Sequence, residues 1–473
     1  MKKTFKIALS CVVLATSSNL YADNLLEIYR LAQDSDPTFL ASEAGTRASS
    51  ERVNQSMSGL LPQLSASYSI SKSSSDSTGV TTVIGAADNP LTVDIDESLP
   101  RNSASNSDST SDGYSINLRQ EIYNHSTWLG LKQSEKRALQ SKINHEGVKQ
   151  SLIVRTAEAY FNVLAAQDSV AFSKAETESV SKELAQTKQR FEVGLIAITD
   201  VHEAQSRYDL ANANQIASQN GLDNAHELLQ QVTGKYHYNL LSLKPEIPLR
   251  NPQPENIKEW VERSESNNIS IKAASVGLEI AKKSISISQS GHYPTIDLSA
   301  SYSDGGRETD SAGTQFFGAL SDTSVTNSDG NQESSSISLN VNIPLYSGGR
   351  TNSQVKESKS LYQQAAHNLE AERRRAVSLT RSSYLGTVAA VSSVKALKQA
   401  VISSEKSLEA TQAGFEVGTR TIVDVLQQTQ ILFNSKRQYA RARYDYVLNI
   451  LRLKQATGML TEDDLAQVNK LLR

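Results

Sequence analysis

The chain has 473 residues, of which 38% are apolar and 21% are charged, and its formal net charge is −3. This slightly acidic balance argues against a nucleic-acid-binding protein with a basic surface. No run of about 20 apolar residues is present, which excludes a polytopic helical membrane protein. The ten prolines all lie outside two stretches, residues 101–244 and 345–473. Long helices with narrow apolar faces are therefore expected there.

The N-terminus has the pattern of a secretory signal peptide, residues 1–22. Three lysines precede the apolar residues 7–14, and small polar residues lead to Ala22, after which we expect cleavage. Cleavage lowers the basic residues from 48 to 45, against 51 acidic residues, and removes Cys11, the only cysteine. The mature chain then has no disulfide and no cysteine-based metal site.

One unit is written twice in the mature chain. Residues 191–201 match residues 415–425 with seven identities in eleven positions. We interpret residues 23–250 and 251–473 as two structural repeats. A proline-rich piece, residues 244–254, links them.

Each repeat is expected to begin with a helix and to end with a long helical hairpin. The first helices are expected at about 38–59 and 256–289, and the hairpins at 126–232 and 350–457. The longer helix of each hairpin has about 65 residues and would span roughly 100 Å. Helices of this length with a thin apolar seam are typical of coiled coils or layered helical arrays.

Between these helices, each repeat carries a strand pair, at about 62–123 and 294–345. Apolar residues alternate with serine and other small polar residues at both ends of each pair. Strands of about 9–11 residues with one apolar face fit the wall of an outer-membrane barrel. The serine-rich segments 72–112 and 303–336 are expected as loops between such strands.

Four strands in one chain cannot close a transmembrane barrel, for which about eight is the minimum. An open sheet edge cannot lie in lipid, so a spanning barrel would need several chains. The alternative is a soluble, half-buried pair of hairpins. The export signal and the lack of an apolar partner layer favour the barrel.

The hairpin turns carry the residues that point to a site. Gly194 and Gly418 lie where a left-handed glycine ends a helix. Asp200 and Asp424 follow near the start of the next helix, where acidic residues commonly cap helices, and Thr421 has capping-box spacing to Asp424. From the residues alone, capping is the favoured interpretation of both aspartates.

The turn motifs also carry a resemblance. The motifs are Val-Gly-Leu-Ile-Ala-Ile-Thr-Asp-Val at 193–201, Val-Gly-Thr-Arg-Thr-Ile-Val-Asp-Val at 417–425, Ser-Gly-Gly-Arg at 347–350 and Ala-Thr-Gly at 456–458. With them the sequence resembles the TolC family of outer-membrane export ducts over nearly the whole mature chain. The resemblance implies an α+β membrane protein and a homotrimer. Its twelve-stranded β-barrel would continue into a long α-helical barrel of coiled-coil hairpins, and an equatorial belt would include the C-terminal segment.

The function that the resemblance implies is an exit duct of tripartite efflux or type I secretion systems, in the outer membrane and extending into the periplasm. The implied partners are a periplasmic adaptor (membrane fusion) protein, an inner-membrane pump of the RND, ABC or MFS type, and outer-membrane lipid. No catalytic arrangement and no metal-ligand spacing occur in the sequence, so we expect no enzyme activity, no cofactor and no resident metal. The competing hypothesis is a periplasmic coiled-coil adaptor or spacer, which would share the helices but not the strand pairs.

In that family the helical tips close the periplasmic entrance. The resemblance implies that Thr199 and Asp200 in the first tip pair with Arg420 in the second. It also implies that Asp424 faces the threefold axis in an acidic ring, where cations could block the channel. Repulsion within such a ring would raise the pKa of its carboxyl groups.

Two positions depart from the family pattern. Phe415 stands where a tyrosine would donate a hydrogen bond to Asp200, and Gln427 stands where a second ring aspartate is found. We therefore expect a closed state held by fewer polar contacts and a weaker cation preference.

Overall fold

The computed structural model describes residues 23–82, 100–317 and 320–473, so the expected signal peptide lies outside the described residues. The chain divides into two compact units. The helical unit comprises the described residues up to Ser49, Leu139–Leu278 and Gln364–Arg473, and the strand unit comprises Ser50–Ala138 and Glu279–Gln363, again where described. Each unit takes residues from both halves of the chain. The division into two sequence repeats therefore stays an interpretation of the sequence.

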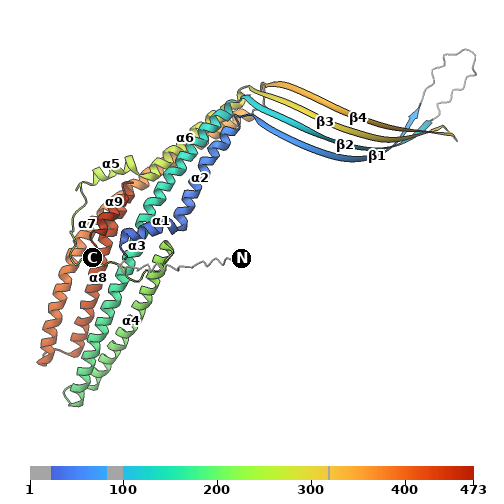
Figure 1. The fold of residues 1–473 in the computed structure, drawn as a ribbon. Coiled ribbons are helices and arrows are strands. Elements are labelled where there is room, and N and C mark those ends of the chain that lie inside the picture. Colours follow the sequence, from blue (N-terminus) through green and yellow to red (C-terminus); the bar gives the residue numbers. More distant parts are fainter. Residues whose placement is uncertain (1–22, 83–99, 318–319) are drawn as a thin grey trace, which may run out of the picture. The chain divides into compact units, whose positions relative to one another are not determined.

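The long helical hairpins are present. The helices are α1 (Leu25–Ser35), α2 (Pro37–Ser58), α3 (His125–Glu192), α4 (Ile198–Thr233), α5 (Ile257–Asn267), α6 (Ile269–Gln289), α7 (Arg350–Glu416), α8 (Ile422–Ala456) and α9 (Glu462–Asn469) (Figure 1). With 68 and 67 residues, α3 and α7 have the expected length. Among the described helices, α7 alone contains a window apolar enough to cross a membrane. It is more than three times as long as the roughly 20 residues a bilayer requires.

The single helix expected at 256–289 is wrong in one respect, because it breaks into α5 and α6 at Asn268. The Asn268 N–H donates to the Ser264 carbonyl at 2.9 Å and so ends α5. Its side-chain oxygen accepts from the Ile271 N–H at 3.2 Å and so begins α6. Asparagine readily makes such local side-chain contacts, which compete with a continuous helix.

The main core lies in the helical unit, where α1, α3, α8 and α9 meet the segment that follows α4. Among its largest buried side chains are Tyr29, Tyr160, Phe161 and Leu451. The Tyr160 hydroxyl donates to the Leu241 carbonyl at 2.7 Å. Apolar burial and satisfied polar groups thus hold the segment between the two halves against the long helices.

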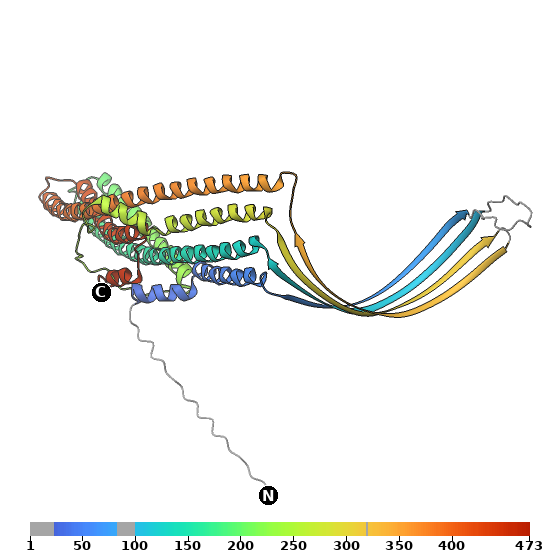
Figure 2. The same cartoon turned by 90° about the horizontal axis from the view of Figure 1, so that it is seen from above.

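The strands form one antiparallel sheet in the order β1-β2-β3-β4. The strands are β1 (Gln63–Thr82), β2 (Pro100–Tyr123), β3 (Thr295–Phe317) and β4 (Leu320–Asn342), which lie side by side in a curved sheet (Figure 2). They have 20 to 24 residues, so the expectation of short strands with long serine-rich loops is wrong.

Serine pairs explain why the strands continue through the serine-rich segments. In the register of the sheet, Ser71 lies opposite Ser111 and Ser303 lies opposite Ser334. Each pair of hydroxyl groups is hydrogen-bonded at 2.8 Å. Cross-strand hydroxyl pairs of this kind stabilise an antiparallel ladder without apolar side chains.

The two faces of the sheet differ in polarity. Serine and other small polar residues line one face, whereas Leu64, Leu118 and Ile337 lie on the other, in the rows nearest the helices. The Leu64 and Ile337 side chains are exposed in the single chain. In the part of the sheet that the structure describes, β1 and β4 are both free edges.

Candidate functional site

Both helical hairpins end in the same kind of turn. Gly194 has φ of +75° and Gly418 has φ of +83°, conformations that other residues rarely adopt. The Leu195 N–H donates to the Arg190 carbonyl at 2.9 Å, and the Thr419 N–H donates to the Gly414 carbonyl at 2.8 Å. This is the Schellman pattern, which satisfies the last carbonyl groups of a helix.

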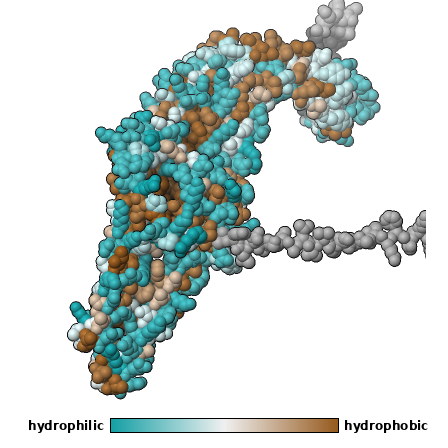
Figure 3. All heavy atoms as spheres, turned by 60° about the vertical axis from the view of Figure 1, so that its left-hand side comes forward, coloured by the Kyte–Doolittle hydropathy of each residue, from teal (hydrophilic) through white to brown (hydrophobic). Residues whose placement is uncertain are grey.

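An apolar cluster, the tip cluster, packs the two hairpins together behind these turns. Its members come from α3, α4, α7 and α8: Val180, Leu184, Ala204, Phe415, Ile422, Val425 and Leu426. The turns beyond the cluster remain apolar and open to solvent. Val193 and Val417 are 70% and 76% exposed, and Figure 3 shows apolar atoms at the surface of the tips.

The two equivalent phenylalanines of the repeat differ in environment. Phe415 is 7% exposed in the tip cluster, whereas Phe191 is 39% exposed. The guanidinium of Arg190 lies over the Phe415 ring, 4.3 Å from its centre, and Nη1 donates to the Phe415 carbonyl at 3.3 Å. This contact between the two tips is absent from the sequence prediction, because nothing in the motif indicates which ring is buried.

Asp424 forms a capping box with Thr421 at the start of α8. The Thr421 N–H and hydroxyl both donate to Oδ2 of Asp424 at 3.0 Å, and the Asp424 N–H donates to the Thr421 hydroxyl at 3.3 Å. These hydrogen bonds, together with the charge of Arg420, lower the pKa of Asp424. The capping interpretation of Thr421 with Asp424 is therefore confirmed. For Asp200 it is wrong, because α4 is capped by Ala197 without a side-chain hydrogen bond.

The other predicted gate residues lie at the surface of the tips. Thr199, Arg420 and Gln427 are exposed and Asp200 is half-buried. The Arg420 side chain lies close to Gly414, where an added Cβ would be 2.8 Å from Cγ of Arg420. Within the described residues of a single chain, Arg420 makes no ion pair with Asp200. Their pairing therefore stays a prediction about the assembled protein.

Three acidic side chains of α3 contact polar side chains of α8 above the tip cluster. The contacts are Asp168–Tyr444 at 2.7 Å, Glu176–Arg437 at 2.8 Å and Glu183–Thr429 at 3.0 Å. Burial raises the pKa of Asp168 and of Glu183. The seven- and eight-residue spacing on both helices is visible in the sequence, but it becomes informative only once the antiparallel pairing of α3 with α8 is known.

Taken together, a sheet with one exposed apolar face, two free edges and long helical hairpins on an exported chain define the class of outer-membrane exit ducts. The family described as "Outer membrane efflux protein" matches residues 28–235 and 260–459. The chain belongs to this family. The competing hypothesis of a periplasmic spacer finds no support.

Relatives and solved structures agree with this assignment. The chain is 37% identical to outer membrane protein TolC of Vibrio cholerae, over 100% of this chain and 99% of the relative. It is 23% identical to the alkaline protease secretion protein AprF of Pseudomonas aeruginosa, over 99% and 91% of the two chains. The CmeC outer membrane channel of Campylobacter jejuni has the same fold, with a TM-score of 0.71 and 16% identity over 96% of this chain and 90% of that one.

Proposed function

We propose that three copies of this chain form one duct with a twelve-stranded barrel in the outer membrane. The observation that carries this proposal is the open four-stranded sheet, whose edges β1 and β4 are unpaired in the described chain and whose apolar face is exposed. Open edges are not tolerated in lipid, and pairing β4 of one copy with β1 of the next satisfies them. Lipid then covers the apolar face and the serine face lines the lumen.

The proposed duct is passive, with no enzyme activity and no cofactor, and it conducts the substrates of tripartite efflux and type I secretion systems. A secretion role is supported by the likeness to the alkaline protease secretion protein. Energy would come from an inner-membrane pump of the RND, ABC or MFS type, joined through a periplasmic adaptor. The exposed apolar tips at Val193, Leu195 and Val417 offer such an adaptor a docking surface.

The same tips would form the gate. In the trimer Arg420 would reach Asp200 and Thr199, and three copies of Asp424 would form the acidic ring at the axis. The apolar burial of Phe415 supplies a contact that does not depend on a hydroxyl group. Close approach of three carboxylates would oppose the lowering of the Asp424 pKa by its capping box.

Single-channel recording in planar bilayers tests the duct and its gate. Purified protein should conduct, and a trimer that never conducts contradicts the proposed function. Arg420→Ser combined with Asp200→Ala should raise the conductance of the resting channel. A control removes the surface pair Lys182–Glu178 on α3, whose atoms are 2.8 Å apart. If the double variant and this control both conduct like the wild type, the proposed pairing is wrong.

The acidic ring is tested by block with a trivalent cation. Asp424→Asn removes the charge but keeps a side-chain oxygen that can accept from the Thr421 N–H. Block should disappear in this variant while its thermal stability stays close to that of the wild type. Unchanged block would place the cation site elsewhere.

A further inference from the structure

The serine face of the sheet carries almost no charge along its middle. One end of this region is marked by the ion pair of Arg119 with Asp297, 3.6 Å apart, and the other end by Asp322. Between them this face consists of serine, threonine, glycine and amide side chains on all four strands, apart from one arginine. In this part of the described sheet, Arg307 on β3 is the single charged side chain on that face. An isolated cation on a neutral polar surface is a feature that the channel function alone does not require.

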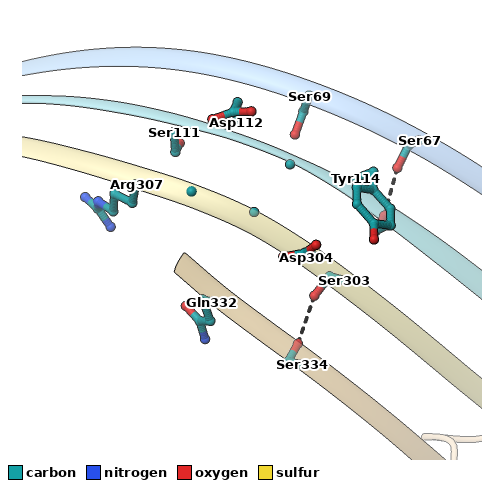
Figure 4. A pocket seen from close by; sticks show the side chains of 14 residues that line it. Ser67, Ser69, Ser111, Asp112, Tyr114, Ser303, Asp304, Arg307, Gln332 and Ser334 are labelled. Atoms are coloured by element: carbon teal, nitrogen blue, oxygen red, sulfur yellow. Dashed lines mark hydrogen bonds between the residues drawn. The ribbon is translucent and has the colours of Figure 1, made fainter. Parts of the chain in front are cut away.

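A hollow of about 400 Å³ lies beside Arg307. Its walls are serines of four strands together with Gln332, and Figure 4 shows Arg307 and Gln332 on neighbouring strands at one end of it. The floor is bare backbone, because Gly113 of β2 lies directly opposite Gly305 of β3. A Cβ on Gly305 would lie 2.6 Å from the Asp112 carbonyl oxygen, so no larger residue fits there without a shift of the backbone.

Arg307 keeps most of its hydrogen-bonding capacity free. Within the described residues its side chain makes one hydrogen bond, from Nη2 to the Ser109 hydroxyl, and this bond is long at 3.5 Å. No carboxylate of the described residues lies within ion-pair distance of it. Asp112 and Asp304 line the hollow through their backbone, since strand alternation turns their side chains to the opposite face. There the Asp112 carboxylate accepts from the Tyr68 hydroxyl at 3.3 Å.

We propose that this hollow is a binding site for multivalent oxyanions, in particular phosphate-bearing molecules, inside the strand barrel. The guanidinium of Arg307 presents a planar fork of donors to phosphate oxygens, and the serine hydroxyls supply further donors. The lumenal position rests on the proposed function, in which the serine face lines the channel. In a trimer, three Arg307 side chains would then form a cationic ring in the strand barrel, opposite in sign to the Asp424 ring at the helical tips.

The test uses inorganic tripolyphosphate as the blocking ion in planar bilayers, added on the side that the strands face. Wild-type channels should show brief blocks that weaken strongly between about 0.1 and 1 M KCl, since the Debye length falls from about 10 Å to 3 Å. Arg307→Gln should weaken the block at least tenfold, and Arg307→Lys should restore part of it. The matched control, Arg119→Gln, removes a cation from the same face that Asp297 already pairs, and should leave the block unchanged.

The outcomes separate this proposal from the proposed function. A protein that does not conduct overturns the duct itself. A protein that conducts with equal block in the wild type and in Arg307→Gln keeps the duct and overturns the anion site. Equal loss in Arg307→Gln and Arg119→Gln would also overturn it, because the effect would then reflect total lumenal charge. Thermal stability equal to that of the wild type in Arg307→Gln verifies that this exposed substitution leaves the barrel intact.

Discussion

The contact of Arg190 with Phe415 ties α3 to α7 at the tips, and its loss should favour the open duct. A partly exposed cation–π contact contributes about 0.5–1 kcal/mol. The long hydrogen bond from the guanidinium to the Phe415 carbonyl adds about 1.5 kcal/mol, the lower end for a charged donor. If opening separates α3 from α7, Arg190→Met removes about 2 kcal/mol from the closed state of each protomer. The ratio of open to closed conformation in each protomer would then rise about thirtyfold, at about 1.4 kcal/mol per factor of ten.

Single-channel open probability measures this change directly, and uptake of a large antibiotic by whole cells measures its consequence. The control is Lys188→Met, one helical half-turn away. Among the described residues, the Lys188 side chain hydrogen-bonds to Gln205 alone, at 3.3 Å and within the same hairpin. An Arg190→Met channel with the open probability of the control would refute the reasoning. It would mean either that the contact persists in the open state or that the tip cluster alone holds the gate.

Two further predictions concern stability in detergent. Burial raises the pKa of Glu183, so the native state binds this proton more tightly than the unfolded chain does, and the stabilisation is lost as the pH rises through the raised pKa. Glu183→Gln, which keeps an acceptor for Thr429, should therefore raise Tm near pH 8 and change it little near pH 4; an equal shift at both values would contradict a buried charge. Gly458→Ala should lower Tm far more than Gly234→Ala. Both glycines have φ near +70°. An added Cβ at 458 would lie 2.3 Å from the Asn267 carbonyl oxygen, whereas at 234 the nearest atom would be 3.4 Å away. Equal losses of Tm would indicate that the backbone dihedral angle alone sets the cost of the substitution.

The long helices could be predicted from two features, the absence of proline and the periodic spacing of apolar residues. Over 101–244 and 345–473 no proline interrupts the chain, and a helix of nearly 70 residues needs little more than that and a thin apolar seam. The ends of the strand pairs could be predicted just as directly, because apolar residues there recur at every second position, as they do in a strand with one apolar face. The strand count already required several chains for a spanning barrel, and the resemblance supplied the expected number of three.

The length of the strands was missed because alternation was sought in apolar residues only. Serine itself recurs at every second position from Ser65 to Ser77, and this is the signal that the structure uses. In the part of the sheet far from the helices, both faces are mostly polar, so hydropathy does not distinguish one face of a strand from the other. A period-two count over hydroxyl residues would have extended β1 to Ser77, close to its observed end at Thr82.

The contacts that tie the hairpins together could not be read from one helix at a time. Glu183 contacts Thr429 only because α3 and α8 pack side by side in antiparallel orientation, and this packing belongs to the tertiary structure. The sequence repeat also gives no indication that the two tips differ in which phenylalanine is buried. A motif match reports shared backbone geometry at the turns, and it says nothing about which copy of a side chain is buried.

That difference assigns unequal roles to the two tips. The second tip has the buried Phe415 and the capping box of Asp424. In the first tip Phe191 is exposed, and the N-cap of α4, Ala197, makes no side-chain hydrogen bond. A helix start without a side-chain cap loses about 1 kcal/mol relative to a capped one. Fraying on opening should therefore begin at the first tip, while α8 keeps Asp424 in a fixed position at its N-terminus. A fixed carboxylate is what a cation-binding ring needs. In the proposed gate, the second tip would therefore be the charge-bearing part and the first tip the part that yields.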